Sequence, residues 1–287
     1  MNNDIINNIN NLPSISQTIK EYNLYTKKKL SQNFILDLNL TNKIVNLSDR
    51  IKYNTIIEIG PGPGSLTRSI LLNGATKVIA IEKDKRFVKV LNKLNMASNN
   101  KIIIENEDAL HIDLNNILDK YNIKNAEIIA NLPYSIATKL LLNWIPFPKK
   151  INQMTLMFQK EVAERITAKP GSKKYGRISI LIGLMVEAKI IMNIPSTAFT
   201  PKPKVDSAIV QIKPKIKKII FNKKILEEIT RNLFNQRRKQ IKSTLVKFGD
   251  PLKICGILDL DPSLRPEQID LNQYEKLAIL IAKDHDL

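Results

Sequence analysis

The first half of the chain alternates short apolar runs with segments in which apolar residues recur at helical spacing. The apolar runs lie at 56–59, 77–81, 102–104 and 128–130, and polar residues or glycine bound each of them. Runs of this length are typical of buried strands. Their separation of about 20–25 residues is that of right-handed βα units. The pattern therefore predicts an α/β, Rossmann-like domain.

After Pro214 the pattern changes from strands to helices. A strand is predicted at 208–212, and a basic linker follows with Lys213, Lys215, Lys217 and Lys218. From Lys224 onward, one broad helical face collects Leu226, Ile229, Leu233, Ile241 and Leu245. A last amphipathic helix is predicted over 271–281. We predict three parts: a mobile tail or loosely packed helix at 1–26, a Rossmann-like domain at 27–214 and a small helical domain at 215–287.

Groups suited to a nucleoside follow three of the predicted strands. Gly60, Gly62 and Gly64 alternate with two prolines after the first strand, and glycine lets a backbone approach a ligand. Glu82 ends the second strand, about 20 residues after Gly60, where an acidic side chain can accept hydrogen bonds from both ribose hydroxyls. Asp108 follows the third strand and could accept from an adenine amine.

The glycine spacing favours a cofactor without phosphates. It departs from the G-x-G-x-x-G pattern that serves a pyrophosphate at a helix N-terminus. A loop stiffened by two prolines better suits S-adenosylmethionine, and the spacing disfavours a nicotinamide-dependent oxidoreductase.

The fourth strand runs into Asn131-Leu132-Pro133-Tyr134. The Asn131 side-chain oxygen, with the carbonyl of Leu132 or Pro133, could grip the two hydrogens of an aromatic exocyclic amine. The Tyr134 ring could stack on the base that carries the amine. A buried strand that ends at an X-Pro turn is the plainer interpretation.

The charge of the chain points to a polyanionic partner. The formal net charge is +18 and the isoelectric point is about 9.8. Nucleic acid is the partner that such a charge favours. The alternative is the coding bias of an AT-rich genome, which enriches Ile, Asn and Lys but need not raise the net charge.

Other chemistries and locations find little support. One cysteine excludes an internal disulfide framework and a Cys-rich metal site, and two histidines leave little for a zinc site, so no metal is expected. No apolar run approaches the roughly 20 residues of a membrane span. The first residues contain no secretory apolar region and no arginine of the kind found in mitochondrial presequences. We expect a cytoplasmic protein.

Several segments together resemble the ribosomal RNA adenine dimethyltransferases. The motifs that carry the resemblance are Leu30–Asp37, Glu58–Thr67, Ala80–Asp84, Glu107–Leu110, Asn131–Tyr134, Phe158–Arg165, Tyr175–Ser179 and Pro195–Ala208. The chain departs from the family in small ways, with Ser31 in place of the usual glycine and Ile35 in place of leucine. The resemblance implies a class I S-adenosylmethionine-dependent methyltransferase fold with a C-terminal helical domain.

The resemblance also implies roles for individual residues. The implied cofactor contacts are Asn33, Ile35, Gly60, Glu82, Asp108 and Asn131, and the residue pattern adds Gln32 and Gly62. The implied catalytic residues are Asn131, Leu132, Pro133, Tyr134 and Phe199. Phe199 would sandwich the target base with Tyr134, and the alternative is a core aromatic in a proline-rich loop. The candidate RNA contacts are Arg177, Lys202, Lys204, Arg237, Arg238 and Lys239, for which the alternative is a solvated surface.

The C-terminal segments bear on the substrate. Phe234–Ile241 and Leu264–Glu267 resemble the members that dimethylate two adjacent adenosines in the hairpin loop near the 3′ end of 16S rRNA. We therefore expect a monomer that acts on the small ribosomal subunit or its precursor, with a role in small-subunit biogenesis. Two alternatives stay open: the Erm group, which methylates 23S rRNA, and a mainly non-catalytic ribosome-assembly factor.

Overall fold

The computed structural model describes residues 3–26, 32–48, 51–215 and 219–284. The chain divides into two compact units. The first comprises Met1–Ala163 and Lys189–Lys213, and the second comprises Glu164–Ala188 and Pro214–Leu287. Lys217 and Lys218 of the predicted basic linker lie outside the described residues, as do Leu30 and Ser31 at the start of the first family motif.

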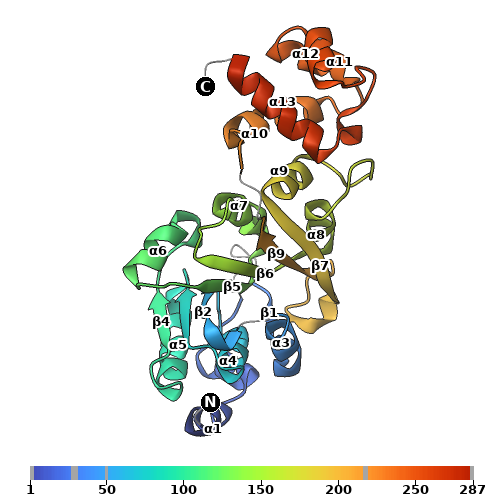
Figure 1. Ribbon diagram of the computed structural model, residues 1–287. Helices are drawn as coiled ribbons and strands as arrows, with labels where there is room; N and C mark the ends of the chain where they lie inside the picture. The colour runs from blue at the N-terminus through green and yellow to red at the C-terminus, as the bar shows by residue number, and fades with distance from the viewer. Residues whose placement is uncertain (1–2, 27–31, 49–50, 216–218, 285–287) are drawn as a thin grey trace. The chain divides into compact units, whose positions relative to one another are not determined.

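A seven-stranded sheet organises the first unit, with strand order β4-β3-β2-β5-β6-β9-β7 (Figure 1). Its strands are β2 (Thr55–Ile59), β3 (Lys77–Ile81), β4 (Ile102–Glu105), β5 (Ala126–Asn131), β6 (Ile151–Gln159), β7 (Val186–Ile194) and β9 (Ser207–Pro214). The first five strands of that order pair in parallel, and β9 runs antiparallel to β6. The order reverses between β2 and β5, which is the topological switch point where open α/β sheets bind ligands.

The parallel register brings the predicted site residues to one edge of the sheet. Ile59 pairs with Ile81, and Ile81 pairs with Glu105. Just beyond these pairs, the Gly60 amide donates to the Ile81 carbonyl at 2.9 Å. The carboxyl ends of β2, β3 and β4 therefore lie side by side, as the sequence predicted.

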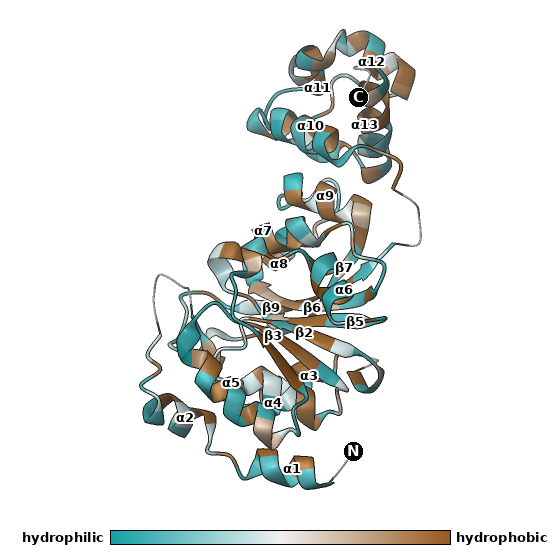
Figure 2. Ribbon diagram, turned by 90° about the vertical axis from the view of Figure 1, so that its left-hand side faces the viewer, coloured by the Kyte–Doolittle hydropathy of each residue, from teal (hydrophilic) through white to brown (hydrophobic). Residues whose placement is uncertain are grey.

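Helices cover both faces of this sheet. The helices α3 (Leu38–Val45), α4 (Ser65–Leu72) and α5 (Lys85–Ala97) lie on one face, and α6 (Leu114–Lys120) and α7 (Tyr134–Trp144) lie on the other (Figures 1 and 2). The central strands are almost wholly buried and appear mainly brown in Figure 2. This layered arrangement confirms the predicted fold class. None of the described helices combines the length and the apolar character that spanning a lipid bilayer requires.

The N-terminal residues pack firmly on the sheet domain, which differs from the mobile tail or loosely packed helix that the sequence predicted. They form α1 (Asn3–Asn10) and α2 (Ile15–Glu21). Ile5 and Ile9 of α1 are buried in the main hydrophobic core, and α1 packs against α4 and α5. The Arg68 guanidinium of α4 also donates to the Pro13 carbonyl at 2.8 Å. Ile5 and Ile9 are four residues apart, the spacing of one helical face, so the sequence did carry a signal for α1, although a short one.

A two-stranded antiparallel sheet joins the segment after α2 to the proline-rich loop. It pairs β1 (Phe34–Ile35) with β8 (Phe199–Thr200). Short helical turns occur at η2 (Ile51–Tyr53), η3 (Ala109–His111) and η4 (Ser196–Ala198).

The second unit is helical. Its helices are α9 (Arg177–Met185), α10 (Lys223–Asn235), α11 (Ile241–Thr244), α12 (Pro251–Leu258) and α13 (Leu271–Asp284), with turns η5 (Leu245–Phe248) and η6 (Pro266–Gln268). The five apolar residues predicted to share one face from Leu226 to Leu245 are all buried, although the helix ends at Asn235 and restarts at Ile241.

The unit begins earlier than the sequence predicted, because residues 164–188 group with the C-terminal helices instead of with the sheet. The short helix α8 (Lys160–Ile166) spans this boundary. Helix α9 packs against α10 and α13, and Gly183 of α9 leaves room for Leu271 of α13. A contact between helices so distant in sequence leaves no local signal at residue 164.

Candidate active site

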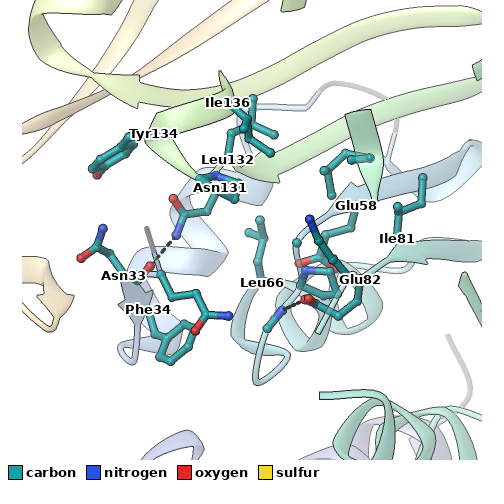
Figure 3. A pocket seen from close by; sticks show the side chains of 18 of the residues that line it. Asn33, Phe34, Glu58, Leu66, Ile81, Glu82, Asn131, Leu132, Tyr134 and Ile136 are labelled. Atoms are coloured by element: carbon teal, nitrogen blue, oxygen red, sulfur yellow. Dashed lines mark hydrogen bonds between the residues drawn. The ribbon is translucent and has the colours of Figure 1, made fainter. Parts of the chain in front are cut away.

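A pocket of about 210 Å³ lies at the carboxyl ends of β2, β3 and β5 (Figure 3). All eight residues predicted as cofactor contacts line it: Gln32, Asn33, Ile35, Gly60, Gly62, Glu82, Asp108 and Asn131. They come from five separate segments of the chain, and the sheet topology brings them together.

The glycine loop between β2 and α4 forms the floor of the pocket. Gly60, Gly62 and Gly64 have φ angles of 67°, 54° and 86°, in the left-handed region that favours glycine. A Cβ atom on Gly62 would lie 3.1 Å from Cε1 of Phe34, which also lines the pocket. The loop therefore passes close under the pocket with no side chain of its own at these positions.

Glu82 holds this loop in place from the end of β3. Its carboxylate accepts a hydrogen bond from the Gly62 amide at 3.0 Å and another from the Asp84 amide at 2.8 Å. Burial raises the pKa of the Glu82 carboxyl. Because a carboxylate offers about four acceptor positions, acceptor capacity remains for a ligand hydroxyl.

Glu58 is a pocket residue that the sequence reasoning passed over. It is 1% exposed, and its Oε2 atom has no hydrogen-bond partner among the described residues. Burial, together with the nearby charge of Glu82, raises the pKa of Glu58 to about 8. A charged residue inside the apolar run 56–59 was the available signal, because such a group is costly to bury unless it meets a partner.

Asp108 lines the pocket from the segment between β4 and η3. Its carboxylate accepts from the Leu110 amide at 3.1 Å and from Lys83 Nζ at 2.7 Å. The Lys83 hydrogen bond lowers the pKa of Asp108. Lys83 also lines the pocket, and the sequence analysis did not single it out.

Asn131 occupies the last position of β5, where its amide is fixed in orientation. Its Nδ2 atom donates to the Asn33 carbonyl at 3.0 Å, as the dashed line in Figure 3 shows. Since the nitrogen is committed to that carbonyl, Oδ1 is the atom left to accept hydrogens from a ligand.

The next three residues form the wall beside Asn131. Leu132, Pro133 and Tyr134 all line the pocket, and Pro133 caps the start of α7. The Pro133 carbonyl already accepts two helical amides, those of Ile136 at 3.0 Å and Ala137 at 3.1 Å. The sequence did not decide whether the Leu132 or the Pro133 carbonyl would accept a hydrogen of the target amine. The structure therefore favours that of Leu132.

Phe199 is not brought into the pocket. It is 3% exposed, belongs to the main hydrophobic core and pairs with Ile35 across the two-stranded sheet. This environment matches the alternative interpretation, a core aromatic in a proline-rich loop. The predicted sandwich with Tyr134 is therefore absent from the described structure.

The candidate RNA contacts fall in both units, each described by itself. In the first unit, Lys202 and Lys204 are exposed on the loop after Phe199. In the second, Arg177, Arg238 and Lys239 are exposed. Arg237 is half-buried and donates to the Lys173 carbonyl at 3.0 Å, with Glu267 3.6 Å away, so it also has a structural role.

The pocket fits the cofactor that the sequence predicted. The bare glycine loop leaves room for a ligand close to the backbone, and the unpartnered Glu58 oxygen offers an acceptor inside the pocket. A search of the described residues finds no group of three His, Cys, Asp or Glu that could hold a metal ion.

Comparisons with known proteins identify the family of the chain. Residues 23–258 match the family described as ribosomal RNA adenine dimethylase. Ribosomal RNA small subunit methyltransferase A of Azorhizobium caulinodans is 40% identical, over 94% of this chain and 93% of that protein. The protein of the same name from Bartonella tribocorum is 42% identical, over 95% of this chain and 99% of its own length.

Solved structures show the same architecture. A dimethyladenosine transferase from Plasmodium falciparum aligns with a TM-score of 0.75 at 25% identity, over 87% of this chain and 97% of that chain. The 23S rRNA methyltransferase ErmE shares the fold, with a TM-score of 0.65 at 20% identity over 86% of this chain and 100% of its own. From its sequence match, its fold and its pocket, we conclude that this chain belongs to the ribosomal RNA adenine dimethylase family of S-adenosylmethionine-dependent methyltransferases.

Proposed function

We propose that this enzyme dimethylates two adjacent adenosines in the 3′-terminal hairpin loop of 16S rRNA. It would act as a cytoplasmic monomer on the small ribosomal subunit or its precursor and contribute to subunit biogenesis. The observation that carries the chemistry is the fixed Asn131 amide at the rim of a nucleoside pocket. The relatives named small subunit methyltransferase A, at 40% and 42% identity, support the substrate.

S-adenosylmethionine, when bound, supplies an electrophilic methyl group on a sulfonium. On this chain, Glu82 would hold the ribose hydroxyls and Asp108 the adenine amine of the cofactor. Gly60 and Gly62 would let the amino-acid portion pass close to the backbone, since neither carries a side chain there.

The target amine is a poor nucleophile because its lone pair is delocalised into the adenine ring. Asn131 Oδ1 and the Leu132 carbonyl would accept its two hydrogens and favour a tetrahedral nitrogen. The same acceptors stabilise the positive charge that develops on that nitrogen. Positioning by the pocket supplies much of the remaining rate enhancement. A proton can then leave to water, so no side chain has to act as a general base.

Tyr134 would stack on the target base, with each stacked base worth about 1–3 kcal/mol. Phe199 is buried in the core, whereas Tyr134 lines the pocket next to Asn131 in the chain, so we assign this role to Tyr134. The base has to be unpaired to enter, and a hairpin loop makes that less costly than a duplex.

The two alternatives differ in substrate or in catalysis. A 23S rRNA substrate is less supported, because the 23S methyltransferase ErmE is 20% identical while the small-subunit relatives are near 40%. A mainly non-catalytic assembly factor would bind subunits without needing Asn131, whose motif is intact here.

The test is transfer of labelled methyl groups to unmethylated small subunits by the Asn131→Ala variant. We expect transfer to fall at least about 100-fold, because a single lost acceptor of developing charge costs that much. Subunit binding should stay within a few-fold of wild type. Asn143→Ala is the matched control, since it removes an exposed amide from the adjoining helix α7. Near-wild-type transfer by Asn131→Ala would refute the mechanism.

A further inference from the structure

We propose that Ser207 is a positioning residue for methyl transfer, whose hydroxyl holds the Tyr134 ring at the pocket and links it to the proline-rich loop. The inference rests on the proposed function, in which Tyr134 stacks on the target base. It goes beyond that function because Ser207 does not line the pocket and would act only through Tyr134.

The contact is a hydrogen bond between two hydroxyls. Tyr134 Oη lies 2.5 Å from Ser207 Oγ, and either can be the donor. Ser207 is completely buried, whereas Tyr134 is half-buried beside the pocket. The side-chain bonds of Tyr134 let its ring swing, and a hydroxyl held at the far end of the ring removes that freedom. The bond therefore fixes the plane on which a base would stack.

The backbone that carries Ser207 is itself rigid. Ser207 is the first residue of β9 and pairs with Gln159 at the end of β6. The preceding carbonyl, of Asp206, accepts from the Lys160 amide at 2.9 Å. The backbone pairing of β9 with β6 therefore fixes the position from which the Ser207 hydroxyl contacts the tyrosine hydroxyl.

The residue before Ser207 also joins the two ends of the proline-rich loop, residues 195–206. Asp206 Oδ1 accepts from the Ser196 amide at 2.9 Å, which joins the two ends of the loop next to Ser207. Exposed Lys202 and Lys204 lie between those ends. An RNA phosphate bound by these lysines would act on the loop whose end carries Ser207, the residue that orients Tyr134. The loop would thereby connect binding of the RNA phosphate backbone with placement of the target base.

A purely structural serine is the competing explanation. A double-mutant cycle separates the two, using Tyr134→Phe, Ser207→Ala and the double variant in transfer to unmethylated small subunits. If Ser207 acts through the tyrosine hydroxyl, each single change lowers kcat on the order of tenfold with little change in the KM for S-adenosylmethionine. The double variant should then be no slower than the singles, because residues in one contact are not additive.

A spectroscopic readout reports the ring directly. A small-subunit hairpin RNA carries 2-aminopurine at a target position, and stacking on an aromatic ring quenches its fluorescence. We expect quenching with the wild-type enzyme and weaker quenching with both Tyr134→Phe and Ser207→Ala at saturating protein. Ser98→Ala is the control, because Ser98 is also completely buried and its Oγ donates at 2.8 Å to the Asn95 carbonyl. It should lower stability and leave quenching unchanged.

The possible outcomes distinguish the positioning role of Ser207 from the proposed function of the enzyme. Additive losses in the double variant, or wild-type quenching in Ser207→Ala, overturn the positioning role while the enzyme keeps its proposed function. A wild-type enzyme that transfers no methyl group to small subunits overturns both. If Ser207→Ala fails to fold, Tyr134→Phe alone still decides, because unchanged quenching in that variant contradicts a role for the hydroxyl pair.

Discussion

Gly62 shows how one position in the site combines two constraints. Its φ angle of 54° favours glycine, and an added Cβ would press on Phe34 at 3.1 Å. Gly171 shares the first constraint, with φ 81°, but an added Cβ there meets nothing within 4 Å. The two glycines therefore separate backbone strain from damage to the pocket.

We predict that Gly62→Ala weakens S-adenosylmethionine binding at least about tenfold, whereas Gly171→Ala leaves it unchanged. Both substitutions should lower the free energy of unfolding by about 1–2 kcal/mol through backbone strain. Calorimetry of cofactor binding and chemical denaturation of the two variants provide the measurements. Equal cofactor affinities for the two variants would contradict the role of the glycine loop in binding the cofactor.

Glu58 gives the site a pH dependence with a definite sign. Its pKa is raised by burial from 4.5 to about 8, so the folded chain holds this proton more tightly than the unfolded chain. Its contribution to stability is therefore present below the unfolded pKa and is lost as the pH rises towards 8. Above the folded pKa, the buried carboxylate is charged, and the full cost of burying that charge lowers the free energy of unfolding.

We predict that the free energy of unfolding of the wild type, relative to Glu58→Gln, falls by a few kcal/mol between about pH 5 and pH 8. The glutamine keeps the shape of the side chain and cannot titrate. Urea denaturation of both proteins across this range checks the difference. Parallel pH profiles would show that Glu58 is not the titrating group.

Among the secondary-structure elements, the N-terminal segment packs against a residue that lines the pocket. Leu24, just after α2, is 1% exposed and forms a small core with Phe34, Phe87 and Val90. Phe34 in turn lies beside Gly62 and packs edge-on against Phe87 with ring centroids 5.6 Å apart. The segment therefore braces a residue that lines the pocket.

We predict that Leu24→Ala lowers the free energy of unfolding by about 2–5 kcal/mol, because it opens a cavity in a packed core. The neighbouring change Tyr25→Ala should cost less than about 0.5 kcal/mol, since that side chain is 74% exposed. Urea denaturation of the two variants makes the comparison. Equal losses would show that residues 3–26 are as loosely attached as the sequence suggested.

The elements that carry the site were predictable because their signals are local. A short apolar run followed by Gly60, Glu82 or Asp108 identifies a strand end, and parallel pairing then places those ends together. Phe199 and residues 164–188 were not predictable in this way. Their environments depend on partners distant in sequence, Ile35 for the first and α13 for the second, which no periodicity reveals.

For the whole molecule, the net charge of +18 is the dominant long-range property. Contacts with phosphates release counterions, so RNA affinity should fall steeply as salt rises. We predict that the double change Arg238→Ala and Lys239→Ala reduces the slope of log affinity against log salt by about 2. Fluorescence anisotropy with a 16S hairpin RNA measures this slope.

The control removes the same charge elsewhere. Lys77→Ala and Lys124→Ala change two exposed lysines near the amino ends of β3 and β5, at the sheet edge opposite the pocket. That pair should leave the slope nearly unchanged. A flat salt response in the wild type would remove the electrostatic argument altogether.

The most direct test of the proposed function is transfer of labelled methyl groups from S-adenosylmethionine to unmethylated small subunits and, in parallel, to 23S rRNA. Digestion and chromatography then identify the modified nucleoside. We predict dimethyladenosine, confined to the two adjacent adenosines of the 3′-terminal hairpin of 16S rRNA. Label in 23S rRNA alone would contradict the proposed substrate, and subunits that bind without acquiring label would contradict the proposed catalysis.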